Sequence, residues 1–179
     1  MELRIGNYLA ASFLLEQEPQ KWHVIAVLDS GKRATEFVEI HARSFLYLRF
    51  DDVEENRPGK QLPTKQFVQQ SLDFAQGKDR LLVTCRAGQG RSVALAYLIG
   101  ARERGVAESL KLLDATRHRP NRLVVSIGDA ILEGLGALAA FDVWRVLNSR
   151  IRLADYYDDI EREFSALEAR GACDRISES

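Results

Sequence analysis

The sequence predicts an α/β fold in a single domain: a central, mostly parallel sheet flanked by helices, with a helical layer formed by the C-terminal part. In the first half of the chain, short apolar runs alternate with helix-like segments, an order typical of parallel sheets; helix-period stripes fill the second half. The 179 residues, 46% of them hydrophobic, are enough for one domain with a core, and no linker or repeat divides them. We therefore expect one domain over residues 1–171, followed by a flexible tail at 172–179.

Four apolar runs have the length of strands. The clearest is 22–28, which ends at the turn signal Asp29-Ser30-Gly31. Residues 44–50 form a similar run. The run 80–84 is apolar and bounded on both sides, as expected of a buried parallel strand. Residues 3–5 have the weakest pattern and suit an edge strand.

Helical segments connect and follow these runs. Thr64 stands at an N-cap position and Gly77 at a C′ position, which predicts a helix between them. A helix follows Ser92 and ends before Gly105; its first part, 93–99, is apolar on all sides. The remaining helical segments are 10–18 (a helix or a loop), 35–40 (a helix or a strand), 106–117, 123–138, 141–147 and a final helix whose apolar face is Leu153, Tyr156, Tyr157, Ile160, Phe164 and Leu167, stopped by Gly171.

The stretch that organises the chain is the loop Cys85–Ser92, between the strand 80–84 and the apolar helix. A strand, a cysteine, a glycine-bearing loop, an arginine and a helix follow one another in that order. The order places a thiol and several backbone N–H groups at the positive end of a helix, which is an anion-binding arrangement.

Each residue type in this loop suits phosphoryl transfer. A free thiol is mostly protonated at neutral pH, but a helix N-terminus and an arginine both favour the nucleophilic thiolate of Cys85. Gly88 and Gly90 let the backbone curl around an anion, and the Arg91 guanidinium offers two parallel hydrogen bonds to phosphoryl oxygens. The Ser92 hydroxyl can donate to the sulfur. The phosphate-binding loop would consist of Arg86, Ala87, Gly88, Gln89, Gly90 and Arg91.

The reaction also needs an acid to protonate the leaving oxygen, and the loop contains none. The candidates are Asp51 and Asp52, which follow the strand 44–50 at the sheet edge where ligands bind in α/β folds. We prefer Asp52 as the acid, with Asp51 as the alternative. The purely structural interpretation is that both are solvated turn residues without a catalytic role. The loop 51–61 is long enough to fold over a pocket.

Other polar residues have simpler interpretations. His23 and His41 read as structural or surface residues, and the basic cluster Arg117, His118, Arg119 and Arg122 reads as a solvated helix end, with steering of an anionic substrate as the alternative. No Cys/His set has metal-ligand spacing, so we expect no metal and no cofactor. Cys173 is far from Cys85, and a structural disulfide is not expected.

Composition limits the partners and the compartment. A net charge of -1 gives no general attraction to nucleic acid or membrane, and no apolar stretch approaches the length of a membrane span. The N-terminus lacks the form of a signal peptide. We expect a cytoplasmic protein whose partner is a phosphorylated protein or a small phosphate monoester; its oligomeric state is open.

Cys85–Ser92 matches the Cys-x5-Arg-Ser/Thr signature of the cysteine-based protein tyrosine phosphatase superfamily. Residues 47–99 resemble its compact dual-specificity branch: an Asp on a loop after a strand, a helix, then the strand, the signature loop and an Ala-Tyr-Leu-Ile helix. Pro120-Asn121 before a helix is similar to a segment of that branch. The resemblance covers residues 22–135 and implies a protein tyrosine phosphatase-like fold.

The resemblance also implies roles for the residues. Cys85 would become a phosphocysteine, Arg91 would bind the phosphoryl group, Asp52 would act as general acid and then base, and Ser92 would assist breakdown of the intermediate. The family commonly has His before the cysteine, where this chain has Thr84. Arg86 and Gln89 do not reproduce the double-Lys loop of the phosphoinositide-directed members.

Phosphotyrosine is the expected substrate, with phosphoserine and phosphothreonine left open because pocket depth decides between them. Two alternatives remain at this point. A rhodanese-like sulfurtransferase also places a cysteine at a strand–loop–helix turn, with one residue fewer between Cys and Arg. A catalytically idle phosphate- or phosphoprotein-binding module would need the loop but not the Asp.

Overall fold

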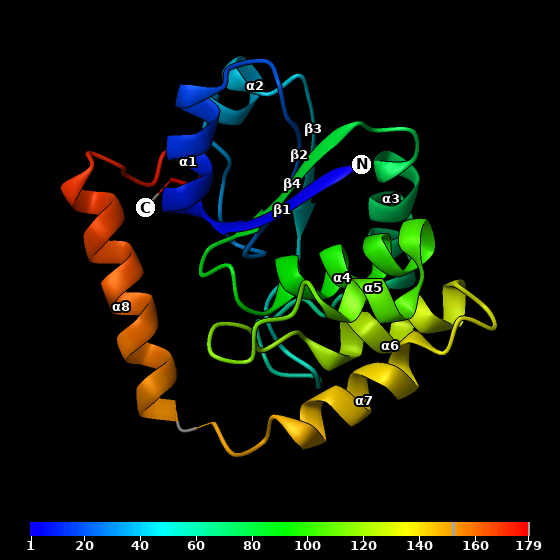
Figure 1. Cartoon of the computed structure of the whole chain (residues 1–179). Coiled ribbons are helices and arrows are strands. Elements are labelled where there is room, and N and C mark those ends of the chain that lie inside the picture. Colours follow the sequence, from blue (N-terminus) through cyan, green and yellow to red (C-terminus); the bar gives the residue numbers. More distant parts are fainter. Residues whose placement is uncertain (152, 179) are drawn as a thin grey trace.

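The computed structural model describes residues 1–151 and 153–178, without the side chains of 153–156. Its centre is a four-stranded sheet in the order β1-β4-β2-β3, formed by β1 (Glu2–Asn7), β2 (His23–Leu28), β3 (Ser44–Arg49) and β4 (Arg80–Cys85). All the pairs are parallel. The sheet is therefore wholly parallel, and the predicted edge strand and the central position of 80–84 are confirmed (Figure 1).

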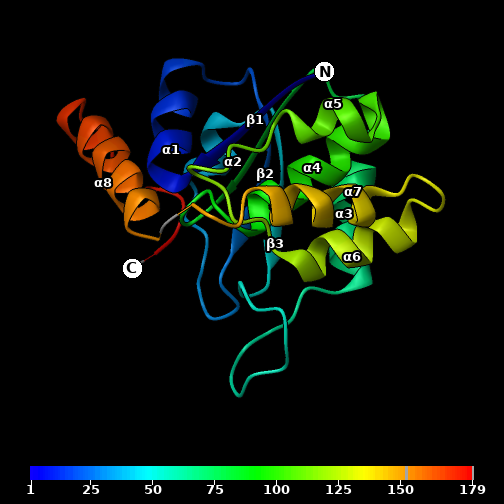
Figure 2. The ribbon, with the colours of Figure 1, turned by 60° about the horizontal axis from the view of Figure 1, so that its bottom comes forward.

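Helices cover both faces of the sheet (Figures 1 and 2). On one face, α1 (Tyr8–Gln17) and α2 (Phe37–His41) pack over a core that includes Val24 and Leu28. On the other face lie α3 (Lys65–Ala75), α4 (Arg91–Arg104), α5 (Val106–Leu110), α6 (Arg122–Ile131) and α7 (Ala137–Leu147), over a core that includes Ile25 and Val27. Because neighbouring β2 residues point to opposite faces, an unbroken apolar run is what a strand covered on both sides requires.

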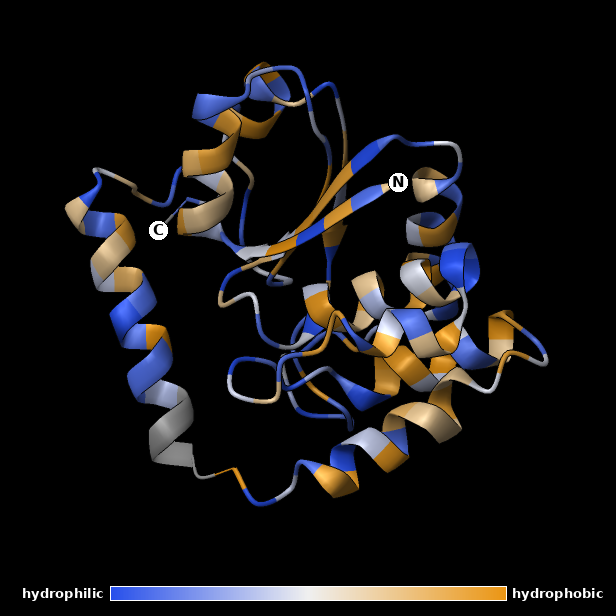
Figure 3. Ribbon diagram, viewed as in Figure 1, coloured by the Kyte–Doolittle hydropathy of each residue, from blue (hydrophilic) through white to orange (hydrophobic). Residues whose placement is uncertain are grey.

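Hydropathy follows this layering. Every residue of β2 is buried, whereas β1 alternates exposed and half-buried positions at the sheet edge. Figure 3 shows the same alternation of colours along β1. Within the described residues, no helix is long and apolar enough to cross a membrane.

Side-chain caps fix several helix boundaries. The Thr64 hydroxyl accepts a hydrogen bond from the Phe67 N–H (3.3 Å), which confirms the predicted N-cap of α3. Gly77 and Gly105 both have positive φ after the helices they end. Asn7 and Asn121 cap α1 and α6 with their side-chain oxygens.

The prediction of one continuous helix over 123–138 is wrong. Helix α6 ends at Ile131, and α7 begins at Ala137. Between them Gly134 and Gly136 take positive φ values of 84° and 68°, a conformation that ends a helix and that glycine adopts without strain. The apolar stripe continues across the turn because both helices bury a face against the same core.

The C-terminal helix α8 (Leu153–Ala169) runs beside α1, where Ile160 is almost fully buried and Arg170 lies over the Phe13 ring. The predicted core positions Leu153 and Tyr156 have side chains outside the described residues. Gly171 has positive φ, as expected of a helix stop.

The segment 172–178, where the sequence predicts a flexible tail, packs against the domain. The Ile176 side chain is completely buried, and its carbonyl accepts a hydrogen bond from the Thr35 N–H (3.0 Å). The Glu178 N–H donates to the Arg33 carbonyl (3.0 Å). Burial of the isoleucine and these backbone hydrogen bonds stabilise the docked segment. The sequence does not indicate this docking, because the segment is otherwise mostly polar.

Candidate active site

The loop Cys85–Ser92 lies at the carboxyl edge of the sheet, between the end of β4 and the start of α4. Cys85 is the last residue of β4, and α4 begins at Arg91. The first three turns of α4, from Arg91 to Ala101, are entirely buried. The positive end of a buried helix dipole is therefore directed at the loop, as the sequence predicts.

Neighbouring segments hold the outer side of the loop. The carbonyls of Arg86, Gln89 and Gly90 accept hydrogen bonds from the backbone N–H groups of Tyr8 (3.5 Å), Arg119 (2.9 Å) and Asn121 (3.3 Å). Because the peptide bonds of this loop are trans, the N–H that follows each carbonyl points the opposite way. The N–H groups of residues 87, 90 and 91 are thus turned away from the supporting segments and are available to an anion.

Gly88 allows the loop to approach β1 closely. It has a φ of 68°, and a Cβ atom there would lie 2.6 Å from the backbone nitrogen of Asn7. No residue with a side chain fits at this contact without moving the backbone. The glycine is therefore required by both the conformation and the space.

The thiol of Cys85 is buried, and its Sγ lies 3.1 Å from the Oγ of the fully buried Ser92. The serine is thus placed to donate to the sulfur. Thr84, at the position of the family's histidine, is also buried and donates from its hydroxyl to the Gly6 carbonyl (3.0 Å). Its side chain ties β4 to β1.

The Arg91 guanidinium is buried and held along one edge. Its Nη1 donates to the Phe50 carbonyl (2.7 Å) and pairs with the Asp29 carboxylate (2.7 Å). Its Nε is buried with no hydrogen-bond partner among the described residues. Burial lowers the pKa of Arg91, but the negative charges of Cys85 and Asp29 outweigh it, so the pKa stays above its ordinary value.

The structure separates the two candidate acids. The carboxylate of Asp51 is buried and accepts hydrogen bonds from the Ser30 hydroxyl (2.6 Å) and the Gln61 N–H (2.8 Å), with Lys60 at 3.3 Å. Burial opposes the charge, but these donors outweigh it and hold the pKa of Asp51 below its ordinary value. Asp51 thus closes the base of the loop 51–61.

Asp52 is exposed and reaches the phosphate-binding loop. A Cβ atom on Gly90 would lie only 2.0 Å from the Asp52 Oδ2, so the carboxylate rests directly on the loop backbone. The Asp52 Oδ1 accepts a hydrogen bond from the Asn121 Nδ2 (2.8 Å). Of the two oxygens, Oδ2 therefore faces the loop while Oδ1 is engaged.

Asn121 connects three parts of the site. Besides holding Asp52, its side-chain oxygen caps α6 by accepting from the Val124 N–H (3.1 Å), and its backbone N–H supports Gly90. The sequence shows Asn121 only as a helix cap next to Pro120. Asp29 was likewise only a turn residue, because its contact with Arg91 depends on β2 and β4 being neighbours.

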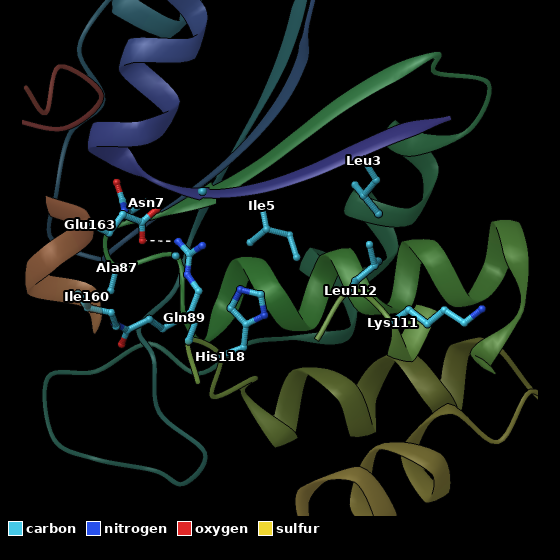
Figure 4. A pocket seen from close by; sticks show the side chains of 13 residues that line it. Leu3, Ile5, Asn7, Ala87, Gln89, Lys111, Leu112, His118, Ile160 and Glu163 are labelled. Atoms are coloured by element: carbon cyan, nitrogen blue, oxygen red, sulfur yellow. Dashed lines mark ion pairs between the residues drawn. The ribbon is translucent and has the colours of Figure 1, made fainter. Parts of the chain in front are cut away.

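Three residues of the basic cluster have partners within the fold. Arg117 pairs with Glu163 of α8, and Arg122 pairs with Asp142 of α7 (2.7 Å). Burial lowers the pKa of His118 to about 4, and its Nδ1 accepts the Asp114 N–H (3.0 Å). Arg117, His118 and Glu163 line a cavity of ≈ 340 Å³ behind the loop. Figure 4 shows this cavity, with His118 and Gln89 below Ile5 of β1.

The remaining singled-out residues make local contacts. His23 lies 2.6 Å from the Ser44 hydroxyl, and the His41 ring contacts the carbonyl of Phe37 one turn earlier. Cys173 is exposed and accepts from the Arg175 Nε. Among the described residues, no group of three or more His, Cys, Asp or Glu could hold a metal ion.

No family model matches this sequence, and no curated protein matches it. Solved structures do match the fold. Human DUSP28 is similar with a TM-score of 0.53 and 17% identity, over 75% of this chain and 94% of that one. DUSP15 is similar with a TM-score of 0.53 and 20% identity, over 84% of this chain and 92% of that one.

Human tyrosine phosphatase-like serine/threonine/tyrosine-interacting protein matches with a TM-score of 0.51 and 18% identity, over 73% of this chain and 90% of that one. This chain therefore has the fold of the dual-specificity phosphatases, which confirms the expected fold class and the fold that the resemblance implies. At these identities the likeness concerns the fold, and the chemistry has to be argued from the residues.

Proposed function

We propose that the protein is a cysteine-dependent phosphatase that hydrolyses phosphate monoesters, foremost phosphotyrosine, through a phosphocysteine on Cys85. One observation carries the proposal. The buried Arg91 has no hydrogen-bond partner for its Nε among the described residues, and it begins the helix that follows the loop with the buried Cys85 thiol. An unsatisfied buried donor is costly, and an oxyanion bound in the loop would satisfy it.

In the first step the Cys85 thiolate attacks phosphorus and the bond to the substrate oxygen breaks. Arg91 and the loop N–H groups stabilise the charge on the transferring phosphoryl oxygens. The leaving oxygen takes its proton from Asp52. Because Asn121 donates to Oδ1, the proton of the acid form belongs on Oδ2, the oxygen that rests on the loop.

In the second step water attacks the phosphocysteine. Asp52, now ionised, takes a proton from that water, the S–P bond breaks and inorganic phosphate leaves. Ser92, 3.1 Å from the sulfur, donates a hydrogen bond that stabilises the departing thiolate. Each step uses protein groups alone, so turnover is expected to be independent of metal.

The substrate class follows from the leaving group and the fold. A phenolate is a better leaving group than an alkoxide, so a phosphotyrosine needs less assistance from the acid than a phosphoserine. DUSP28 and DUSP15, two of the solved structures that share the fold, are dual-specificity phosphatases, which supports testing phosphoserine and phosphothreonine beside phosphotyrosine.

The test is hydrolysis of para-nitrophenyl phosphate and of phosphotyrosine, phosphoserine and phosphothreonine peptides with a chelator present. We expect turnover in the intact protein, none in Cys85→Ser, and a large loss in Arg91→Ala. Asp52→Ala should lower kcat while leaving peptide binding to the Cys85→Ser background unchanged. Asp51→Ala should instead lower the thermal stability.

The outcomes separate the alternatives. An intact protein that binds phosphopeptides through Arg91 but never turns them over would be a binding module. Sulfur transfer from thiosulfate to cyanide that depends on Cys85, without phosphatase activity, would favour a rhodanese-like enzyme. A loss of kcat in Asp51→Ala but not in Asp52→Ala would overturn the choice of acid.

A further inference from the structure

A second pocket, of ≈ 210 Å³, adjoins the rim of the phosphate-binding loop. Its wall on the side of the loop includes Arg86, the residue directly after Cys85, and Asp29, which pairs with Arg91. Lys32, three residues after Asp29, lines it as well. The pocket therefore adjoins the loop in which the phosphate of a substrate would bind.

The C-terminal segment forms another part of the lining. Asp174, Ser177 and Glu178 line the pocket, and the segment is fixed by the buried Ile176 and by an antiparallel bridge between Ser177 and Ala34. The Arg175 N–H donates to the Ser12 hydroxyl (3.2 Å) further back. This segment is thus part of the folded domain.

The charges of the pocket are unequally balanced. The Asp29 carboxylate is engaged by Arg91, and Asp174 accepts hydrogen bonds from the N–H groups of Ile176 (2.9 Å) and Ser177 (3.4 Å). By contrast, no ion pair or side-chain hydrogen bond joins Lys32 or Arg86 to another described residue. Lys32 is half-buried and Arg86 is exposed.

Two cations without acidic partners therefore line a pocket in which Glu178 is the one lining carboxylate with no such contact to a described residue. An anion beside the ammonium group of this half-buried lysine would provide a charge-assisted contact. The position next to the phosphate-binding loop means that the anion would be carried by the substrate.

We propose that this pocket is a subsite for a second anionic group on the substrate, an acidic side chain close to the phosphorylated residue of a peptide. Lys32 and Arg86 bind the anion, and the C-terminal segment closes the subsite. This inference rests on the proposed function, because it needs the phosphate monoester to occupy the loop.

The experiment compares phosphotyrosine peptides that differ only next to the phosphorylated residue. Glu is compared with the neutral, equally long Gln, and with a second phosphotyrosine that offers phosphate in place of carboxylate. Para-nitrophenyl phosphate, which has no second anionic group, reports the basal reaction. The variants are Lys32→Ala and Lys32→Glu. Lys21→Ala is the control with the same change in charge, because Lys21 precedes β2 and so lies at the end of the strands away from the loop.

We expect the intact protein to have a kcat/KM about fivefold higher for the Glu peptide than for the Gln peptide, the size of a partly exposed ion pair. Lys32→Ala should remove this preference, Lys32→Glu should invert it, and Lys21→Ala should preserve it. High salt should weaken it. Ile176→Asp, which expels the buried side chain of the C-terminal segment, should also weaken it. All these variants should keep their activity on para-nitrophenyl phosphate.

Equal kcat/KM for the Glu and Gln peptides, with normal activity on para-nitrophenyl phosphate, would overturn the subsite and leave the proposed function standing. A preference that survives Lys32→Ala would also overturn it. If kcat/KM is higher than that of the Gln peptide for the doubly phosphorylated peptide but not for the Glu peptide, the subsite binds phosphate and the proposed carboxylate ligand is wrong. Absence of any turnover would overturn the proposed function, and calorimetric binding of the same peptides to Cys85→Ser would then test the subsite separately.

Discussion

Substitution of Gly90 by alanine tests whether the contact between Asp52 and the loop is catalytic. The new Cβ atom would lie 2.0 Å from the Asp52 Oδ2, so the carboxylate must move to the 3.4 Å of an ordinary contact, a displacement of about 1.4 Å. Gly90 has a negative φ (-108°, with ψ -81°), so alanine does not have to take a left-handed conformation there, and the displaced atom is the end of a flexible side chain. The acid therefore moves while the fold is retained.

The size of the effect follows from the role of a general acid. Positioned acids contribute roughly 10²- to 10⁴-fold in rate, and a displacement of about 1 Å costs about 10²-fold. We expect Gly90→Ala to lower kcat on phosphotyrosine peptides by about 10²-fold. The loss on para-nitrophenyl phosphate should be smaller, because its leaving group needs less protonation.

The assay is steady-state kinetics of Gly90→Ala, Asp52→Ala and the double variant. Because both changes act on one carboxylate, the double variant should be no slower than Asp52→Ala alone. Gly31→Ala is the control, since its Cβ meets nothing within 4 Å. An unchanged kcat in Gly90→Ala, or losses that multiply in the double variant, would refute the reasoning.

Three further predictions concern neighbouring residues. Asn121→Ser keeps a capping oxygen but loses the donor to Asp52, so kcat should fall about tenfold with the melting temperature nearly unchanged, whereas Asn121→Ala should also cost about 1 kcal/mol of stability. Asp29→Ala frees one edge of Arg91 and should raise the inhibition constant of inorganic phosphate about tenfold; an unchanged constant would contradict a positioning role. Burial lowers the pKa of His118 from 6.5 to about 4 in the folded protein. Between these two pH values the imidazole is protonated in the unfolded state but neutral in the folded state, so the unfolded state binds more protons. Stability should therefore fall by roughly 2–3 kcal/mol as pH drops through this window, and urea titrations of His118→Gln should show a flatter pH dependence.

The parts of the site that are local in sequence could be predicted. The strand, the loop and the helix around Cys85 carry their signals within one continuous stretch, and the order of residues alone places a thiol at a helix N-terminus. Asp51 and Asp52 were both candidates because they follow a strand, and the geometry supports the preference for Asp52 without testing it. The catalytic roles remain proposals.

The contacts that depend on strand order could not be predicted. Asp29 reaches Arg91 because β2 lies next to β4, and hydrophobic periodicity identifies strands without giving their order. The burial of Ile176 could not be predicted because a single large apolar residue in a polar segment forms no periodic hydrophobic pattern. The two glycines, Gly134 and Gly136, are a signal for a helix end in the sequence. The apolar stripe on both sides of them nevertheless favoured one continuous helix.

The close packing of Gly88 on Asn7 also determines how the loop loses its shape. In the described part of the chain, β1 is an edge strand that pairs with β4 alone. The loop packs on its last residues through the Gly88 contact and is held by the N–H of Tyr8, the residue directly after β1. Edge strands open more easily than the strands at the centre of a sheet. When β1 separates from β4, the anion-binding loop loses its backing even though β2, β3 and α4 remain folded.

The free energy of this partial opening, rather than that of global unfolding, therefore sets the fraction of molecules with an intact loop. Amide hydrogen exchange would measure it directly, since the amides of β1 and of residues 86–90 should exchange together and ahead of those in α4. An anion bound in the loop would slow the exchange of both groups by the same factor. Heat or mild denaturant would then abolish activity before the domain melts.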